Sequence, residues 1–176
     1  MKKLFTRLIA AALVFVSSAC ATVHAADMTD HLENKLIDAL FRGVSYTMPT
    51  TLAVALHTAA CSDSSAGTEV TTSGSTGYLR VALNPSTSNW ASTGGAGTTT
   101  NPSAGTGGTT SNNSAITFPT ATANWGTVGW FSIWDNSTVG AGNMLFCKAL
   151  SGGSQAVNSG STPSFAAGAL TVQIDN

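Results

Sequence analysis

The chain has 176 residues, of which 9% are charged, and its formal net charge is −1 at pH 7. Domains of roughly 100–150 residues with about 25% charged side chains are typical, so this length fits one domain whose surface is polar mainly through hydroxyls and amides. Lysine and arginine occur singly after the first few residues and form no basic stripe, which argues against DNA or RNA as a partner.

Residues 1–25 have the pattern of a cleaved Sec signal peptide. Three basic residues open the segment, an apolar run follows at 8–16, and small residues precede the expected cleavage site after Ala25. The apolar run is shorter than the roughly 20 residues needed to span a bilayer, so we expect a secreted or periplasmic chain with no membrane contact after cleavage. A lipoprotein-type signal ending at Cys20 is the alternative.

The remaining residues, 26–176, are expected to form a single β-rich domain with an N-terminal helix over 30–42. Apolar residues recur there every three or four positions, with polar residues on the other face. Leu36 and Phe41 belong to this apolar stripe. The stripe can pack on the protein's own sheet or form an interface with a neighbouring copy.

The ends of this helix also carry recognisable signals. Asp30 is expected to cap the first turn, and Gly43 to end the helix in a left-handed conformation. Asp38 and Arg42 stand four residues apart, the spacing of an ion pair on a helix surface.

After Pro49 the period of the pattern changes from helical to two, as expected for a strand with one buried face. Leu52, Val54 and Leu56 alternate with smaller or polar residues there. Clusters of Gly, Ser, Asn and Pro then separate further candidate strands. Together these segments predict a mainly β protein, an antiparallel β-sandwich preceded by one amphipathic N-terminal helix. The further strands are expected at 77–83, 115–118, 128–134, 144–150 and 169–174.

Residues 92–113 are predicted to form a Gly/Ser/Thr-rich loop. The segment has no charge and no large apolar residue, so it cannot contribute to a core. It is either a solvated surface excursion or a long, weakly patterned hairpin stabilised by its neighbours.

Cys61 and Cys147 are the two cysteines that remain after the leader is removed. An even pair in an exported chain can form a disulfide. The alternative is two small buried hydrophobic residues, because free cysteine is among the most buried residue types.

No catalytic, cofactor-binding or metal-binding residue is predicted, and we do not expect an enzyme. His31 and His57 have no second ligand at zinc spacing, and no Gly-x-Ser-x-Gly motif is present. The carboxylates that glycoside hydrolysis would need stand alone in loop-like or terminal contexts, so we interpret them as solvated loop acids. These residues are Asp63, Glu69, Asp135 and Asp175.

The four tryptophans are candidate surface-binding aromatics. Trp90 and Trp125 each follow an asparagine near the end of a candidate strand, and Trp130 and Trp134 share one face of another. They can form a stacking platform for glycans or a hot spot for a partner protein. The alternative is that the last three are core residues, with Trp90 the least core-like.

Four segments of the chain resemble a family of small phage and prophage virion proteins, described as tail or tail-fibre proteins. The resemblance implies a virion component that assembles with itself and with other virion proteins and has no enzymatic activity or cofactor. It transfers no catalytic or ligand residue. The segments are 28–43 (MTDHLENKLIDALFRG), 51–58 (TLAVALHT), 115–127 (AITFPTATANWGT) and 163–172 (PSFAAGALTV).

The signal peptide is unusual beside this resemblance, because virion proteins assemble in the host cytoplasm. Met28 looks like a natural start for the family, yet a leader precedes it. The alternative function is therefore an exported module derived from a prophage gene that binds glycans or cell surfaces.

Overall fold

The structure is a computed structural model, and the proposed signal peptide lies outside the residues that it describes. The fold is mainly β, with antiparallel strands and one short N-terminal helix, as the sequence predicts. No helix within the described part of the chain is long and apolar enough to cross a membrane. The described residues are 28–72, 74–93, 97, 103 and 107–174.

The helix α1 spans Asp30–Phe41 and precedes eleven strands in the described part of the chain. The strands are β1 (Ala53–Ala59), β2 (Thr68–Glu69), β3 (Val81–Ala82), β4 (Thr109–Ser111), β5 (Ile116–Thr117), β6 (Gly126–Val128), β7 (Trp130–Trp134), β8 (Met144–Ala149), β9 (Gln155–Val157), β10 (Ser164–Phe165) and β11 (Thr171–Gln173).

The largest sheet has the order β2-β1-β7-β8, and β3 also pairs with β1. All of its pairings are antiparallel, and the register places Ala55 opposite Ser132 and Ser132 opposite Cys147. These three residues therefore form a row across β1, β7 and β8 on one face of the sheet, because directly opposed residues in a ladder point to the same side. The residues directly before and after these three along each strand point to the other face of the sheet.

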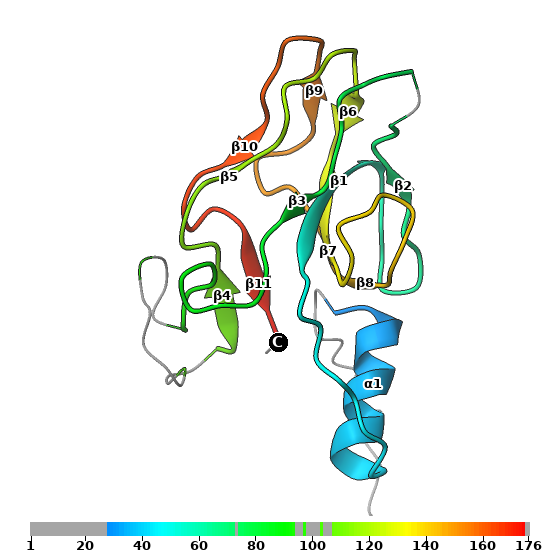
Figure 1. The fold of residues 1–176 in the computed structure, drawn as a ribbon, viewed down its shortest axis with the longest axis vertical. Coiled ribbons are helices and arrows are strands. Elements are labelled where there is room, and N and C mark those ends of the chain that lie inside the picture. Colours follow the sequence, from blue (N-terminus) through cyan, green and yellow to red (C-terminus); the bar gives the residue numbers. More distant parts are fainter. Residues whose placement is uncertain (1–27, 73, 94–96, 98–102, 104–106, 175–176) are drawn as a thin grey trace, which may run out of the picture.

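The other layer is made of short two-stranded ladders instead of one continuous sheet. The antiparallel pairs are β5 with β10, β4 with β11, and β6 with β9. Figure 1 shows the first two of these ladders on the opposite side of the molecule from the main sheet. The architecture is thus sandwich-like, with short ladders opposite the main sheet, whereas β6 leads through Gly129 directly into β7 of that sheet.

The main hydrophobic core lies between these layers. β1 and β7 contribute alternate residues, and the short strands and the segments between them contribute the rest, among them Tyr78 and Trp125. Burial of these apolar side chains is the main favourable contribution to folding, at about 25 cal/mol per Å² of apolar surface removed from water. The buried members are Val54, Leu56, Val70, Tyr78, Leu83, Ile116, Phe118, Ala121, Trp125, Val128, Phe131, Ile133, Val157, Leu170 and Val172.

Two expected strands and the expected loop differ most clearly from the structure. The strand expected at 128–134 divides at Gly129 into the end of β6 and the start of β7, and these pair with different partners. Within the strand expected at 77–83, only the two residues of β3 pair with another strand. Residues 92–113 are not all loop, because Thr109–Ser111 form β4 through backbone pairing with β11, which requires no large side chain.

The helix ends match the sequence signals in part. Gly43 adopts a left-handed φ of 70°, and Asp38 pairs with Arg42 at 2.8 Å, as predicted. The prediction for the N-cap was wrong, because Thr29 holds that position and makes no side-chain cap. Its hydroxyl donates instead to the carbonyl oxygens of Met144 and Leu145 at 2.6 and 3.2 Å, which connects the start of α1 to β8.

Candidate functional site

The most exposed apolar surface in the described structure lies on α1 and the segment that follows it. Ile37, Leu40 and Phe41 share one helix face by their spacing, and the exposed Val44 follows the left-handed turn at Gly43. Leu40 is 73% exposed and Phe41 is 81% exposed. We call these four residues the apolar ridge. Exposed apolar side chains are ordinary when scattered, whereas a group on one face marks an interaction surface.

Only the N-terminal half of α1 packs on the β body. Leu32 is buried with Met28 and Leu145, and Leu36 packs at the edge of this cluster. Leu36 and Phe41, both predicted as interface residues, therefore have different surroundings. Leu36 belongs partly to the protein's own packing, whereas Phe41 extends into solvent, where Figure 1 shows α1 projecting from the strands.

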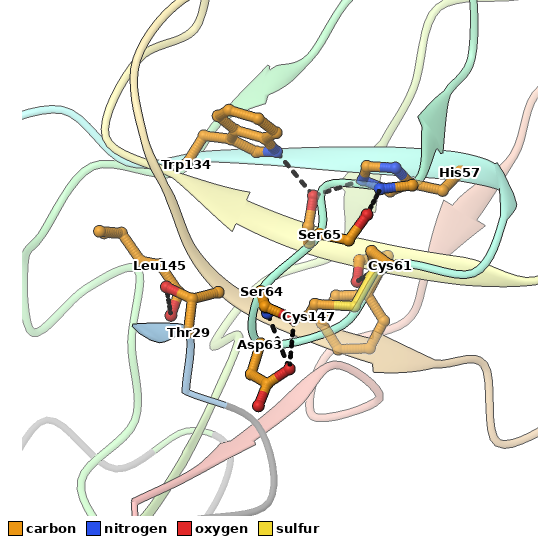
Figure 2. The surroundings of a disulfide bond; sticks show 12 residues. Thr29, His57, Cys61, Asp63, Ser64, Ser65, Trp134, Leu145 and Cys147 are labelled. Atoms are coloured by element: carbon orange, nitrogen blue, oxygen red, sulfur yellow. Dashed lines mark hydrogen bonds between the residues drawn. A yellow bond between two sulfur atoms is a disulfide. The ribbon is translucent and has the colours of Figure 1, made fainter. Parts of the chain in front are cut away.

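The sulfurs of Cys61 and Cys147 are bonded in the structure, and the two Cα atoms lie 6.0 Å apart. Cys61 follows β1 and Cys147 lies on β8, so the bridge passes over the intervening strand β7. Figure 2 shows the bridge with Thr29, Leu145 and His57 around it. The disulfide thus connects two strands that are not neighbours in the main sheet.

A cluster of buried polar side chains lies on the same face of the sheet as the disulfide. The Nε2 atom of His57 is 2.6 Å from the Oγ of Ser132, and the indole of Trp134 donates to the same Oγ at 2.7 Å. Both His57 and Ser132 are fully buried. Burial lowers the pKa of His57 to about 4, with Glu69 opposing this shift and Arg80 adding to it.

Arg80 and Glu69 extend this cluster. Arg80 donates to both carboxylate oxygens of Glu69 at 2.8 Å and to the carbonyl oxygens of Asn136 and Ala141 at 2.8 Å. Its guanidinium carbon lies 3.9 Å from the centroid of the Trp134 ring. The arginine therefore connects the sheet to the loop after β7.

Tyr78 completes the network. Its hydroxyl donates to Glu69 at 3.1 Å and accepts from the backbone N–H of Leu56 at 2.9 Å. Burial, with the Glu69 carboxylate, raises the pKa of the Tyr78 hydroxyl above its usual range. The interpretation of Glu69 as a solvated loop acid was wrong, because its carboxylate neutralises a buried guanidinium.

Burial limits the chemistry that this polar cluster can perform. A serine and a histidine at hydrogen-bond distance are two parts of a nucleophilic site, yet neither His57 nor Ser132 contacts solvent in this structure. Among the described residues, no group of three or more His, Cys, Asp or Glu side chains is arranged to hold a metal ion. The polar cluster therefore lies in the interior, whereas the apolar ridge is exposed.

The four tryptophans do not form a shared surface. Trp125 is buried in the main core, where its indole donates to the carbonyl of Thr76, and Trp134 is buried on the opposite face of the sheet. The prediction that these two offer surface-binding rings was wrong, because packing covers them. Trp90 is partly buried against the main core, and its indole donates to the carbonyl of Leu83. Trp130 is partly buried against the cluster that contains Cys61 and Trp134.

A hollow of about 260 Å³ opens beside Phe165, in the layer of short ladders. Its floor is apolar, with Leu56, Phe118 and Val157 among the lining residues. A second hollow of similar volume shares Phe165 and Gln155 with the first. Sequence reasoning missed both, because their lining comes from strands that pair only in the folded chain.

The described structure therefore defines a mainly β protein with an interior polar cluster, a disulfide and one exposed apolar helix face. A family described as podophage GP4 fiber I protein gp80 matches residues 27–173, and the chain belongs to this family of phage fibre proteins. It is accordingly a virion structural protein. No curated protein matches the chain.

Proposed function

We propose that this protein is a non-enzymatic subunit of a phage fibre that acts by assembling with copies of itself and with other virion proteins. The observation that carries the proposal is the apolar ridge. Leu40 and Phe41 are large, exposed and adjacent on a helix that lies within the segment matched by the fibre family. Large apolar and aromatic side chains of this kind fill the centres of protein interfaces.

The low charge of the chain supports contact between copies. A net charge of −1 gives little electrostatic repulsion, which is the usual means of keeping protein surfaces apart. A fibre needs a repeated interface, and homo-oligomers with closed symmetry are the commonest soluble assemblies. We therefore expect a homo-oligomer in which the ridge of each copy is covered.

Three further observations bear on catalysis, domain organisation and glycan binding in turn. The Ser132–His57 pair is enclosed by protein, so a substrate has no route to it in this structure. The family match extends from 27 to 173, nearly the whole segment proposed as the mature chain, which favours residues 26–176 acting as one domain. The buried positions of Trp125 and Trp134 remove half of the platform on which a glycan-binding function would depend.

Export is the second part of the proposal. The signal pattern in residues 1–25 would direct the chain to an oxidising compartment, and a disulfide is stable there. A chain exported in this way starts at Ala26 and joins surface fibres or filaments outside the cytoplasm, unlike virion proteins that assemble within it.

The test is mass spectrometry of intact particles or fibres purified from the native source. We expect the chain in stoichiometric amounts, with Ala26 as its first residue and cross-links that join α1 to another chain. Absence of the chain from particles, together with a monomer in the periplasm or medium, would contradict the assembly function. A particle-bound chain that retains Met1 would contradict export alone.

A further inference from the structure

The Cys61–Cys147 disulfide joins the two segments that hold the start of α1. On β8, two residues before Cys147, the carbonyl of Leu145 accepts from the backbone N–H of Thr29 at 3.0 Å. In the loop that begins at Cys61, the carbonyl of Asp63 accepts from the backbone N–H of Asp30 at 3.1 Å. We call these two attachment points the helix socket.

The loop side of the socket is held mainly by local turns. Ser62 and Ser65 exchange backbone hydrogen bonds, and the carboxylate of Asp63 accepts from the backbone N–H of Ser64 at 2.7 Å. Residues 62–68 are exposed. Exposed loops with local hydrogen bonds and few buried apolar contacts open at low free-energy cost, so the bridge at Cys61 is the strongest link between this loop and β8.

The strand side carries the remaining attachment. The backbone of Met28 bridges to Phe146, and the Thr29 hydroxyl donates to the carbonyl of Met144 at 2.6 Å. Beyond Leu36 the helix contributes little buried surface, and its last turn is exposed. The direction in which α1 presents the apolar ridge therefore depends on the socket at its N-terminus.

We propose that the Cys61–Cys147 disulfide is a redox-dependent clamp that fixes α1 to the β body. With both thiols reduced, the loop side of the socket opens and the first turn of α1 loosens. Oxidation closes the socket and orients the ridge for assembly; this last consequence rests on the function proposed above, whereas the clamp itself does not.

Closing the clamp is a two-electron oxidation. The two protein thiols lose two protons and two electrons as the S–S bond forms, and a small disulfide such as glutathione disulfide accepts them to give two thiols. The clamp would thus be open in the reducing cytoplasm and closed after export.

The experiment is amide hydrogen exchange on the chain 26–176 at a concentration where it is monomeric, before and after reduction. We expect amides in the first two turns of α1 to exchange at least tenfold faster after reduction, and amides of β7 to change much less. The variant with both Cys61→Ser and Cys147→Ser should match the reduced protein and no longer respond to reductant. Equal acceleration in α1 and β7 would overturn the clamp, since the bridge would then add only global stability.

Thr29→Val provides a matched control, because it removes the hydroxyl contacts to β8 and leaves the disulfide intact. In the oxidised protein it should loosen the same turns of α1; no change there would overturn the socket. Assembly is then measured separately by light scattering of the oxidised and reduced chains. If α1 responds to reduction while the oxidised chain remains monomeric at every concentration, the clamp is supported and the proposed assembly function is contradicted.

Discussion

The guanidinium of Arg80 binds the carboxylate of Glu69 through two hydrogen bonds, from Nε to Oε1 and from Nη2 to Oε2, both at 2.8 Å. The Arg80 side chain is fully buried, and Glu69 is 13% exposed. Removing one partner of such a pair leaves an uncompensated buried charge. Glu69→Gln should therefore lower the free energy of unfolding by about 3 kcal/mol, measured by urea denaturation.

The ion pair between Asp38 and Arg42 on α1 is a suitable control, because it has a similar distance and is largely exposed. Asp38→Asn should cost less than about 0.5 kcal/mol, since water screens both charges. Equal losses in the two variants would mean that burial does not determine the importance of the Glu69 carboxylate.

The disulfide should contribute strongly to stability. It closes a loop with a sequence separation of 86 residues. In the chain-entropy description, such a loop gives an upper value of about 4–5 kcal/mol. Thermal unfolding with and without reductant should show a lower Tm after reduction, and the double variant Cys61→Ser, Cys147→Ser should show no response. Two free thiols in the unfolded, alkylated protein from the native source would contradict the bridge.

Stability should also fall in mild acid because of His57. Its folded-state pKa is about 4, against an ordinary value near 6.5, so between these values the unfolded chain binds more protons than the folded chain. The contribution is complete above about pH 6.5 and is lost as the pH falls toward 4, by up to about 3 kcal/mol.

Urea unfolding at pH 7 and pH 4.5 checks this dependence on His57. His57→Gln keeps a polar group near Ser132 and has no titrating ring, so it should lose much of the difference between the two pH values. His31→Gln, on α1, should retain the wild-type difference. An unchanged pH dependence in the His57 variant would assign the acid sensitivity to other groups.

The sequence predicts the long, strongly periodic elements of this fold well. The spacing of apolar residues and Gly43 identify α1, and alternation identifies β1 and β8, because these segments bury enough side chains to show their period. Short strands such as β4 and β10 were missed. They form through backbone pairing with distant segments, and two or three residues are too few to show a period.

The interior site was harder to predict. Glu69 and Arg80 are eleven residues apart in the sequence, and other partners of Arg80 are backbone carbonyls, which carry no sequence signal. One regularity is present, since Thr76, Tyr78 and Arg80 are buried and alternate with the exposed Gly77 and Leu79. For α1, the apolar stripe was visible in the sequence, but only the structure separates its packed half from its exposed half.

The exposed half of α1 gives the last prediction. Wild-type protein should form a multimer at high micromolar concentration, and Phe41→Asp should yield monomers, because a carboxylate in a buried interface loses its hydration without a partner. The 81% exposure of Phe41 means that the fold itself should be almost unaffected, with a change in Tm of no more than about 2 °C. Light scattering and thermal unfolding of the same samples separate these effects.

Two variants complete this experiment. Leu79 is 59% exposed and lies outside the ridge, so Leu79→Asp should leave the multimer intact. Leu36 packs at the edge of the cluster formed by Met28, Leu32 and Leu145, so Leu36→Asp should destabilise the fold by about 2 kcal/mol or more. A multimer that dissociates equally with Leu79→Asp and Phe41→Asp would place the interface elsewhere. A wild-type chain that stays monomeric would leave the ridge without a role in self-assembly, because the same side chains would then be exposed in the working protein.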